Sequence, residues 1–353
     1  MTMTTSPAAP ARAPESTAMF REAAEAARVV SDQIEHNRDI ARDIGRLLRE
    51  RDPAFMLTVA RGSSDHAATY GKYLVETRSG LFTASAAPSV NSIYKAPMQF
   101  ERGACIVISQ SGASPDLLAV AEAARRGGAP VIALVNVESS PLAEMADAVL
   151  PLRAGPENSV AATKSFIGSL SALVQLTAEW QDDQDLRDAL ATAPEHLAAA
   201  WDCDWSAALE PIMATRSLFT LGRGIGLGIA QEAALKFKEV CGLHAEAYSS
   251  AEVLHGPVTI ARDAFPMLVM AQDDATAPGV RDLVAELSGR DLTLMTAGVT
   301  APGAIELPTP SAHPVIEPLL RIQSFYRLAN QLSLALGQDP DNPPFLRKVT
   351  ATV

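Results

Sequence analysis

Two pairs of landmarks at one spacing indicate that this sequence contains an internal duplication. Arg61 directly follows an apolar run in the first half of the chain, and Arg223 directly follows another in the second half, at an offset of 162 residues. Gln110 and Gln272 each follow a later apolar run and lie at the same offset. Equal spacing at two landmarks is typical of a duplicated domain, so we expect both halves to adopt the same fold.

Short apolar runs alternate with longer helical segments within each half, which predicts an α/β fold with parallel sheets covered by helices on both faces. We expect strands at 55–60, 105–108, 130–136, 147–152, 217–222, 265–274 and 291–298, and long helices at 20–51, 160–182 and 185–210. The expected domains are a disordered tail at 1–18, a first domain with a leading helix at 19–195, a second domain at 196–340, and a C-terminal tail at 341–353 that closes over the site.

The clearest functional signal lies at residues 105–116, where a strongly apolar run passes straight into hydroxyl-bearing residues. The apolar run predicts a strand buried on both faces, and Ser114, followed by proline, is the expected N-cap of a helix. Between them lie Ser109, Gln110 and Ser111, whose neutral donors at the positive end of a helix dipole suit a phosphate group. The alternative is an ordinary strand-to-helix loop, in which serine and glycine are also common.

The duplication favours the phosphate interpretation for the first half alone. Where the first half has the Ser-Gln-Ser sequence, the second half has Ala271, Gln272, Asp273 and Asp274. Two carboxylates in the corresponding cup would repel a phosphate. We therefore expect a single phosphate site, in the first half.

The composition and charge of the chain limit the kinds of molecule that it is expected to bind. The 353 residues carry a net charge of −12 and have a pI near 5.0, which argues against binding to nucleic acid because that binding needs Lys and Arg. Residues 1–18 lack a continuous apolar core, so we expect neither a signal peptide nor a membrane-spanning helix. Three cysteines, Cys105, Cys203 and Cys241, show no paired spacing, which predicts no disulfide framework and fits a reducing cytoplasm.

A glycine-rich segment, GRGIGLG at 222–228, invites comparison with dinucleotide-binding loops. Leu227 and Ile229 occupy the positions where the third glycine of that fingerprint would stand. The segment therefore argues against a nucleotide-dependent oxidoreductase.

Three charged residues further along, Glu232, Lys236 and Glu239, are spaced so that they share one face of a helix. A carboxylate on this face would be an effective base if partial burial raised its pKa from about 4.3. Lys236 beside it could stabilise a developing oxyanion. The alternative is a solvated helical stripe that contains an ordinary Glu–Lys pair.

Seven segments carry a further signal: RGSSDHAA, ISQSGASPD, NSVAATKSF, LGRG, QEAALKFKEV, HAEAYSSAEVLHGP and DPDNPPFLRKVT. In this order they resemble the sugar isomerase (SIS) domain family, and most closely the isomerase half of glucosamine-6-phosphate synthase and the stand-alone SIS-type glucosamine-6-phosphate deaminases. The resemblance implies two duplicated SIS domains and a hexosamine 6-phosphate substrate.

The resemblance also implies roles for individual residues. Gly62, Ser63 and Ser64 match the first sugar-binding loop, Ser109, Gln110, Ser111 and Ser114 match the phosphate-binding loop, and Val160 matches a residue that lines the sugar site. Glu239 matches the base, His255 a ring-opening histidine that the neighbouring subunit of a homodimer supplies, and Lys348 a C-terminal lysine of the synthase. From the shared helix face we add Lys236 to the catalytic set and Glu232 to the substrate-binding set. Outside this context, His255 could be structural and Lys348 a surface lysine.

Two positions depart from the synthase pattern. Ala162 stands where the synthase has a serine that contacts the sugar, which bears on substrate preference. Thr2 follows Met1 where the synthase has the cysteine of its glutaminase domain. Without that domain no ammonia would be channelled to the site, so we expect the breakdown direction.

The expected function is therefore that of a glucosamine-6-phosphate deaminase, which forms fructose 6-phosphate and ammonia. Deglycation of a fructosamine 6-phosphate and aldose–ketose isomerisation are the alternatives within the enzymes, and a sugar-phosphate-sensing regulatory module is the alternative outside them. No cofactor is expected. A metal is not expected either, because the spacings of His244, Glu246, Glu252 and His255 match no ligand motif.

Overall fold

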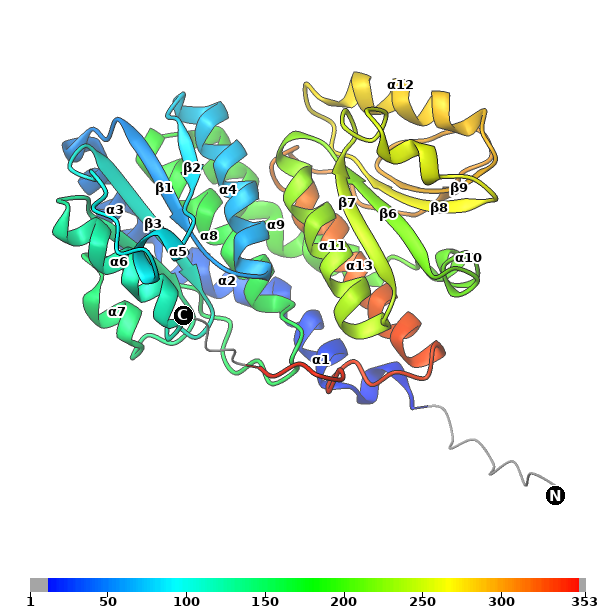
Figure 1. The fold of residues 1–353 in the computed structure, drawn as a ribbon, viewed down its shortest axis with the longest axis horizontal. Helices are drawn as coiled ribbons and strands as arrows, with labels where there is room; N and C mark the ends of the chain where they lie inside the picture. Colours follow the sequence, from blue (N-terminus) through cyan, green and yellow to red (C-terminus); the bar gives the residue numbers. More distant parts are fainter. Residues whose placement is uncertain (1–11, 349–353) are drawn as a thin grey trace.

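The computed structural model describes residues 12–348 and contains two parallel five-stranded sheets, one in each half of the chain (Figure 1). The first sheet has the order β2-β1-β3-β4-β5, with strands Thr83–Ser85, Phe55–Val59, Gly103–Ser109, Val131–Val135 and Ala148–Pro151. The second has the order β7-β6-β8-β9-β10, with strands His244–Ser249, Ser217–Gly222, Phe265–Met270, Leu292–Ala297 and Ile305–Glu306. The two orders are identical once the strands are renumbered, which confirms the duplicated α/β fold.

The longer helices of the first half are α2 (Ala26–His36), α3 (Arg38–Arg51), α4 (Ser63–Ser79), α6 (Pro115–Arg126), α8 (Lys164–Gln181) and α9 (Gln184–Asp202), with the shorter α1 (Ala18–Ala24), α5 (Ser89–Ser92) and α7 (Pro141–Met145). The second half adds α10 (Leu209–Met213), α11 (Leu227–Cys241), α12 (Ala277–Ser288) and α13 (Glu317–Ala335). Helices α8, α9, α11 and α13 lie between the two sheets, and α12 covers the far side of the second sheet (Figure 1).

One hydrophobic core joins the two halves. It contains Ile106 and Leu134 from the first sheet together with Leu268 and Met295 from the second, all of them buried. Smaller clusters lie on the outer faces, under α6 and under α12. Because the inner faces of both sheets pack on the same helical layer, the two halves form one body, and the carboxyl ends of their strands are held in fixed positions.

The strand that leads into the predicted phosphate loop is the central one of its sheet. All seven residues of β3 are buried, and β3 pairs with β1 on one side and β4 on the other. This confirms the expectation of a strand buried on both faces, and it places the loop after Ser109 at the middle of the sheet edge.

The structure corrects three expectations about element boundaries. The leading helix is not continuous over 20–51 but consists of α1, α2 and α3, because the buried Asn37 interrupts it and donates its side-chain amide to the Pro151 carbonyl at 2.7 Å. Residues 12–18 are ordered, since Thr17 caps α1 and Arg12 binds Asp341, whereas residues 1–11 lie outside the described part. The boundary expected between 195 and 196 falls inside α9.

Candidate active site

The loop after β3 is shaped by one hydroxyl and one glycine. The Ser109 hydroxyl accepts a hydrogen bond from the Gly112 backbone N–H at 3.0 Å, which folds the loop back on itself. Gly112 has a φ of +62°, and a Cβ at this position would lie 2.2 Å from the Ser140 Oγ. Only glycine fits this backbone conformation and this close approach, so the loop conformation depends on Gly112.

Helix α6 begins where this loop ends. Ser114 occupies the N-cap position with an extended backbone, Pro115 is the first helical residue, and the Ser114 side chain makes no capping hydrogen bond. The N-terminus of this twelve-residue helix therefore presents the positive end of its dipole at the sheet edge. An anion that binds the neighbouring hydroxyl groups would be stabilised there.

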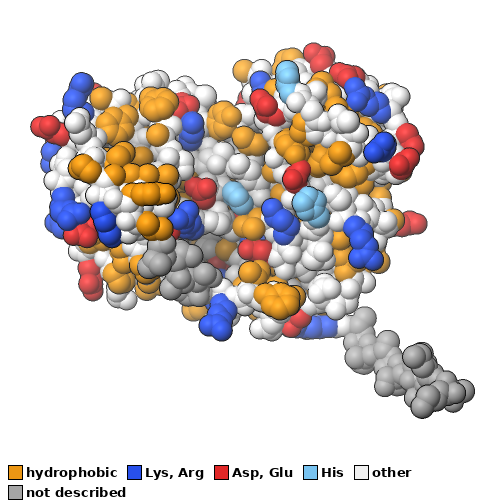
Figure 2. Space-filling view, in the orientation of Figure 1, with side chains coloured by type: hydrophobic (Ala, Val, Ile, Leu, Met, Phe, Trp, Pro, Cys, Tyr) orange, Lys and Arg blue, Asp and Glu red, His pale blue; other side chains and the backbone are white. Residues whose placement is uncertain are grey.

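A cavity of about 360 Å³ lies over this loop. The predicted residues that line it are Gly62, Ser63, Ser64, Ser109, Gln110, Ser111, Ser114, Val160, Lys236, Glu239 and Lys348, together with Ala162. The cavity is thus built from three parts of the chain: the edge of the first sheet, helix α11 of the second half, and the C-terminal segment. Figure 2 shows the hollow between the two halves on the face viewed there.

The charged face of α11 is buried rather than solvated. Glu232 and Lys236 have no exposed surface, and Lys236 Nζ lies 3.2 Å from Glu232 Oε1. Lys236 also contacts the Glu239 carboxylate and donates to Ser63 Oγ at 3.1 Å, while 22% of the Glu239 side chain remains exposed. The alternative of a solvated stripe is therefore wrong. Glu239 is the member of this group that reaches the cavity, held there by Lys236.

The ionisation of this pair follows from its contacts. Burial alone would raise the pKa of Glu232, but the charge of Lys236 and the hydrogen bond from His66 outweigh it, so this pKa is lowered. Burial alone would lower the pKa of Lys236, but the charges of Glu232 and Glu239 outweigh it, so this pKa is raised. Lys236 is therefore an ammonium group at neutral pH, at the wall of the cavity.

Two residues that sequence patterns did not indicate complete the surroundings of Glu232. His66 Nδ1 lies 3.0 Å from Glu232 Oε2, and the Tyr326 hydroxyl donates to Glu232 Oε1 at 3.2 Å. Burial raises the pKa of Tyr326 well above its usual range, so its phenol stays protonated and serves as a donor. Sequence analysis placed Glu232 among the substrate-binding residues, but Glu232 does not line the cavity. It instead supports Ser63 and Lys236, which do line it.

The C-terminal segment reaches the cavity through Lys348. Its ammonium group donates to the Ser159 carbonyl at 2.7 Å and lies 3.5 Å from Glu157 Oε2. Glu157 is buried, and it also accepts hydrogen bonds from the start of α8 and, at 3.4 Å, from Gln110 of the phosphate loop. Lys348 thus lies at the cavity, in the C-terminal tail at 341–353. Residues 349–353 of that tail lie outside the described part.

His255, like Glu232, is a predicted site residue that this chain does not bring to the cavity. It lies in the exposed segment after β7, where its backbone N–H donates to the Glu252 carbonyl at 2.9 Å. The His255 side chain is exposed and does not line the cavity.

A family model supplies the name for this architecture. The model of the SIS domain matches residues 51–178 and 212–301, which together make up more than half of the chain. The chain belongs to the SIS domain family. Its two matches correspond to the two parallel sheets, so the duplicated SIS domains inferred from the sequence are confirmed.

Individual SIS proteins show the same architecture. The glutamine–fructose-6-phosphate aminotransferase of Thermococcus kodakarensis is 30% identical over 350 residues, which cover 94% of this chain and 57% of that protein. A solved structure from Silicibacter pomeroyi DSS-3, named "putative phosphosugar isomerase", is 44% identical and has a TM-score of 0.88, covering 92% of this chain and all of that one. The glucosamine-6-phosphate deaminase of Thermotoga maritima, 22% identical, covers 92% and 100% with a TM-score of 0.71, which shows a shared fold. The chain spans about half the length of the curated relatives it matches.

The second SIS domain has filled the position that corresponds to the phosphate loop. The Gln272 side chain donates to the Arg223 carbonyl and to the Asp274 carboxylate, both at 2.9 Å. A Cβ at Gly226 would lie 2.4 Å from Gln272 Oε1, so the Gln272 side chain packs closely against the start of α11. Asp274 in turn accepts from the Thr276 backbone N–H. The asymmetry between the halves is thus one of side-chain contacts as well as of charge.

Arg61 is a further residue of the SIS site that sequence analysis used only as a landmark. Its guanidinium binds the buried Asp116 carboxylate, at 2.7 Å through Nη2 and 2.8 Å through Nε, and it lines the cavity. It brings the positive charge nearest to the serine loop on the first-half side. Its position after β1 could have suggested this, because β1 neighbours β3 in the sheet.

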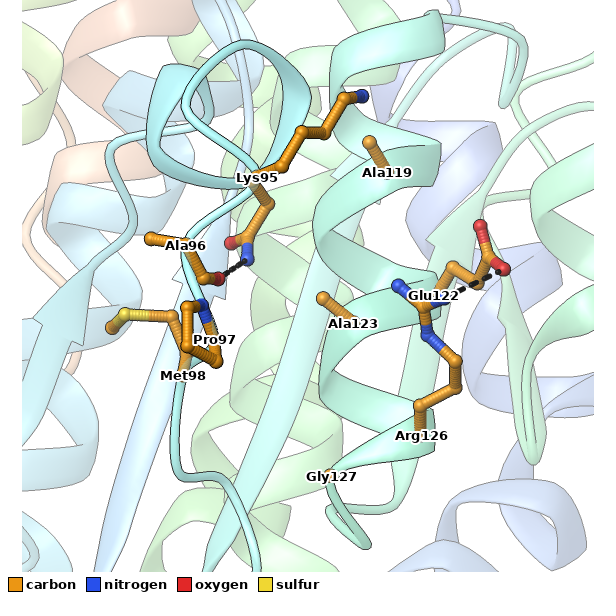
Figure 3. A pocket seen from close by; sticks show the side chains of 10 residues that line it. Lys95, Ala96, Pro97, Met98, Ala119, Glu122, Ala123, Arg126 and Gly127 are labelled. Carbon is orange, nitrogen blue, oxygen red and sulfur yellow. Dashed lines mark hydrogen bonds and ion pairs between the residues drawn. The ribbon is translucent and has the colours of Figure 1, made fainter.

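Another cavity, of about 420 Å³, lies on the outer side of the first SIS domain (Figure 3). It separates the segment at 91–98 from α6, and its charged lining comprises Lys95 and the ion pair between Glu122 and Arg126. It contains none of the serines of the phosphate loop and no group of α11. This outer cavity therefore lacks the groups expected of the candidate site, although its volume is similar to that of the cavity over the serine loop.

None of the helices within residues 12–348 is long and apolar enough to cross a membrane. No group of three His, Cys, Asp or Glu side chains in the same range is arranged to hold a metal ion.

Proposed function

We propose that this SIS protein is an enzyme that converts glucosamine 6-phosphate and water to fructose 6-phosphate and ammonia. The observation that carries the proposal is that one cavity holds both a neutral hydroxyl loop at a helix N-terminus and a carboxylate paired with a buried ammonium group. The first feature suits a phosphate, and the second suits proton transfer beside a developing oxyanion.

The phosphate would be held by the Ser109–Ser114 loop, with Arg61 at its edge. With the phosphate fixed there, the sugar extends toward α11, because Ser63, Lys236 and Glu239 line the remainder of the cavity. A closed sugar ring must open first, and histidine suits this step because its pKa lies near neutrality. His255 is exposed on its own chain, which supports its use in the cavity of a second copy in a homodimer.

The central step is a proton transfer from C2 to C1. Glu239 would take the C2 proton of the open-chain aminosugar, and the electrons would move to the aldehyde oxygen, which the Lys236 ammonium would stabilise. Return of the proton to C1, with one amino proton passing to the O1 alkoxide, leaves an imine at C2. Water then adds to this imine, and ammonia leaves. We assign the breakdown direction because ammonia in neutral solution is mostly ammonium, which is not a nucleophile.

The reaction is tested with purified protein and glucosamine 6-phosphate by measuring ammonia and fructose 6-phosphate together. Glu239→Gln keeps the shape of the side chain but cannot accept a proton, so we expect turnover to fall by roughly 10²–10⁴-fold with little change in substrate affinity. The control is Glu210→Gln, which changes an exposed carboxylate on α10 and should leave turnover unchanged. In deuterated water, the wild type should place deuterium in the ketose product.

The second candidate function is aldose–ketose isomerisation of a sugar phosphate without nitrogen. The 44% identity to the Silicibacter pomeroyi protein favours it, and the same proton transfer would serve it. A substrate panel of glucosamine, galactosamine, glucose and fructosamine 6-phosphates separates the two. Isomerisation of a nitrogen-free sugar with no ammonia from either aminosugar would refute the deaminase, whereas activity on the fructosamine alone would indicate a deglycase. Binding without any turnover would indicate a sensor.

A further inference from the structure

The second SIS domain contains a cavity of about 370 Å³ at the carboxyl ends of its strands, on the side of the sheet that α12 covers (Figure 1). Its floor includes Ala271 after β8, Gly298 after β9 and Leu307 after β10. Ligands of parallel α/β sheets bind beyond the carboxyl ends of the strands. This cavity is separate from the candidate active site, because none of its lining residues lines the other cavity.

The cavity exists because the duplication is incomplete. In the first half, α7 follows β4, packs against α6 and β4, and donates the Leu142 backbone N–H to the Gly112 carbonyl. In the second half, residues 298–304, which join β9 to β10, form no helix. The space that α7 fills in the first half is therefore open in the second, and the chain has not closed it with larger side chains.

Several polar groups around this space are not used by the protein itself, although the Thr309 hydroxyl donates to the Pro310 carbonyl at 3.4 Å. The Thr296 side chain is buried, and its hydroxyl has no hydrogen-bond partner. Arg281 on α12 and Glu306 on β10 form no ion pair within residues 12–348. Thr296 and Glu306 are register partners in parallel strands, so their side chains leave the sheet on the same face. A buried hydroxyl without a partner is costly, and a bound polar molecule would relieve that cost.

We infer that this cavity is a second binding site, which takes a small metabolite carrying both an anionic group and an ammonium group. Arg281 binds the anionic group, Glu306 binds the ammonium, and the hydroxyls of Thr296, Thr300 and Thr309 bind the polar atoms between them. Val299 supplies an apolar contact, whereas the Leu307 side chain packs in the central core. Aminosugar phosphates and α-amino acids both have this chemistry. The site lies on the domain that lost its phosphate loop, so it adds a ligand to the molecule without competing with the substrate.

The test measures binding by calorimetry to the full chain that carries Ser111→Asp, a substitution in the first cavity. We expect glucosamine 6-phosphate or L-glutamine to bind once per chain, and Arg281→Ala in addition to weaken that binding at least about tenfold, since a hydrogen bond to a charged group is lost. The control is Arg290→Ala, which removes an exposed arginine just after α12 that pairs with Glu286 outside the cavity. Glucose 6-phosphate, which lacks the ammonium group, should bind more weakly.

Binding by the aminosugar phosphate alone or by glutamine alone identifies which of the two sources the site uses. The proposal is overturned if neither binds, if the Arg281 and Arg290 variants behave alike, or if glucose 6-phosphate binds as well as its amino counterpart. If the Ser111→Asp chain does not fold, the number of glucosamine 6-phosphate molecules bound per chain is measured without that substitution. We expect two molecules per chain in the wild type and one in Arg281→Ala. These outcomes are independent of turnover, so a failed deaminase assay leaves this test standing.

Discussion

The Ser111 side chain lies in a loop where neutrality matters. The loop after β3 presents hydroxyls and a helix N-terminus to its cavity, and it contains no carboxylate of its own between residues 109 and 115. The second domain has Asp273 at the corresponding position, beside a Gln272 side chain whose amide is bonded within the protein. A single substitution, Ser111→Asp, can therefore give the loop of the first domain the negative charge that the second domain has at this position.

We expect Ser111→Asp to abolish measurable binding of sugar phosphates at this cavity, because like-charge repulsion in a partly enclosed cup exceeds the loss of one hydrogen bond. Ser111→Ala is the matched variant, and it should weaken binding only about tenfold, the equivalent of one hydrogen bond. Calorimetry with glucosamine 6-phosphate measures both. Equal affinity for the Asp variant and the wild type would exclude this loop as the phosphate site.

A site residue can be predicted from the sequence when its contacts are close to it along the chain. The serine loop was recognisable because its strand, its loop and its helix N-cap are consecutive in the sequence. His66 and Glu157 were missed, since each is defined by partners far away: Glu232 lies 166 residues beyond His66, and Lys348 lies 191 residues beyond Glu157. No local pattern marks such a residue, because its role arises only when distant segments meet.

At the scale of elements, helix α11 is unusual in carrying its charges on a buried face. Lys236 is fully buried between Glu232, Glu239 and Ser63, whereas Lys238, two residues later, is exposed. The periodicity of the helix placed the three charges on one face correctly. It could not show which face would be buried, since that depends on the packing of α11 against α4 and α13.

We expect Lys236→Met to lower the free energy of unfolding by about 3–5 kcal/mol, because it leaves Glu232 buried without its cation. Lys238→Met in the same helix is the control, and it should change that free energy by less than about 0.5 kcal/mol. Urea denaturation followed by circular dichroism measures both. Similar values for the two variants would show that the buried pair does not contribute to stability.

The strands that sequence patterns missed, β2, β7 and β10, lie at sheet edges, whereas the edge strand β5 was expected at 147–152. β2 and β10 contain only three and two residues, and β7 is rich in polar residues such as His244 and Glu246. Such strands are stabilised by pairing with a neighbour rather than by an apolar pattern of their own. The central strands were predictable because both of their faces are buried.

At the scale of the whole molecule, the role proposed for His255 requires a second copy of the chain. His255 is exposed and outside the cavity that holds Glu239. We expect a homodimer in solution in which mixed dimers of His255→Ala and Glu239→Gln chains regain part of the activity, because one of their two sites has both groups intact. Each variant alone should be inactive. A fully active monomer by light scattering would contradict this arrangement.

Helix α13 and the segment after it bind both halves together. α13 packs against α1, α8, α9 and α11, and the Asp341 carboxylate accepts hydrogen bonds from the first backbone N–H groups of α1, 322 residues away from Met19. During synthesis, therefore, a nascent chain that has not yet released residue 317 from the ribosome lacks the helix that joins α9 of the first half to α11 of the second. Contacts of such long sequence separation form slowly and leave apolar surface exposed meanwhile. We expect the packing between α9 and α13, and with it the complete inner core, to form only after α13 has left the ribosome.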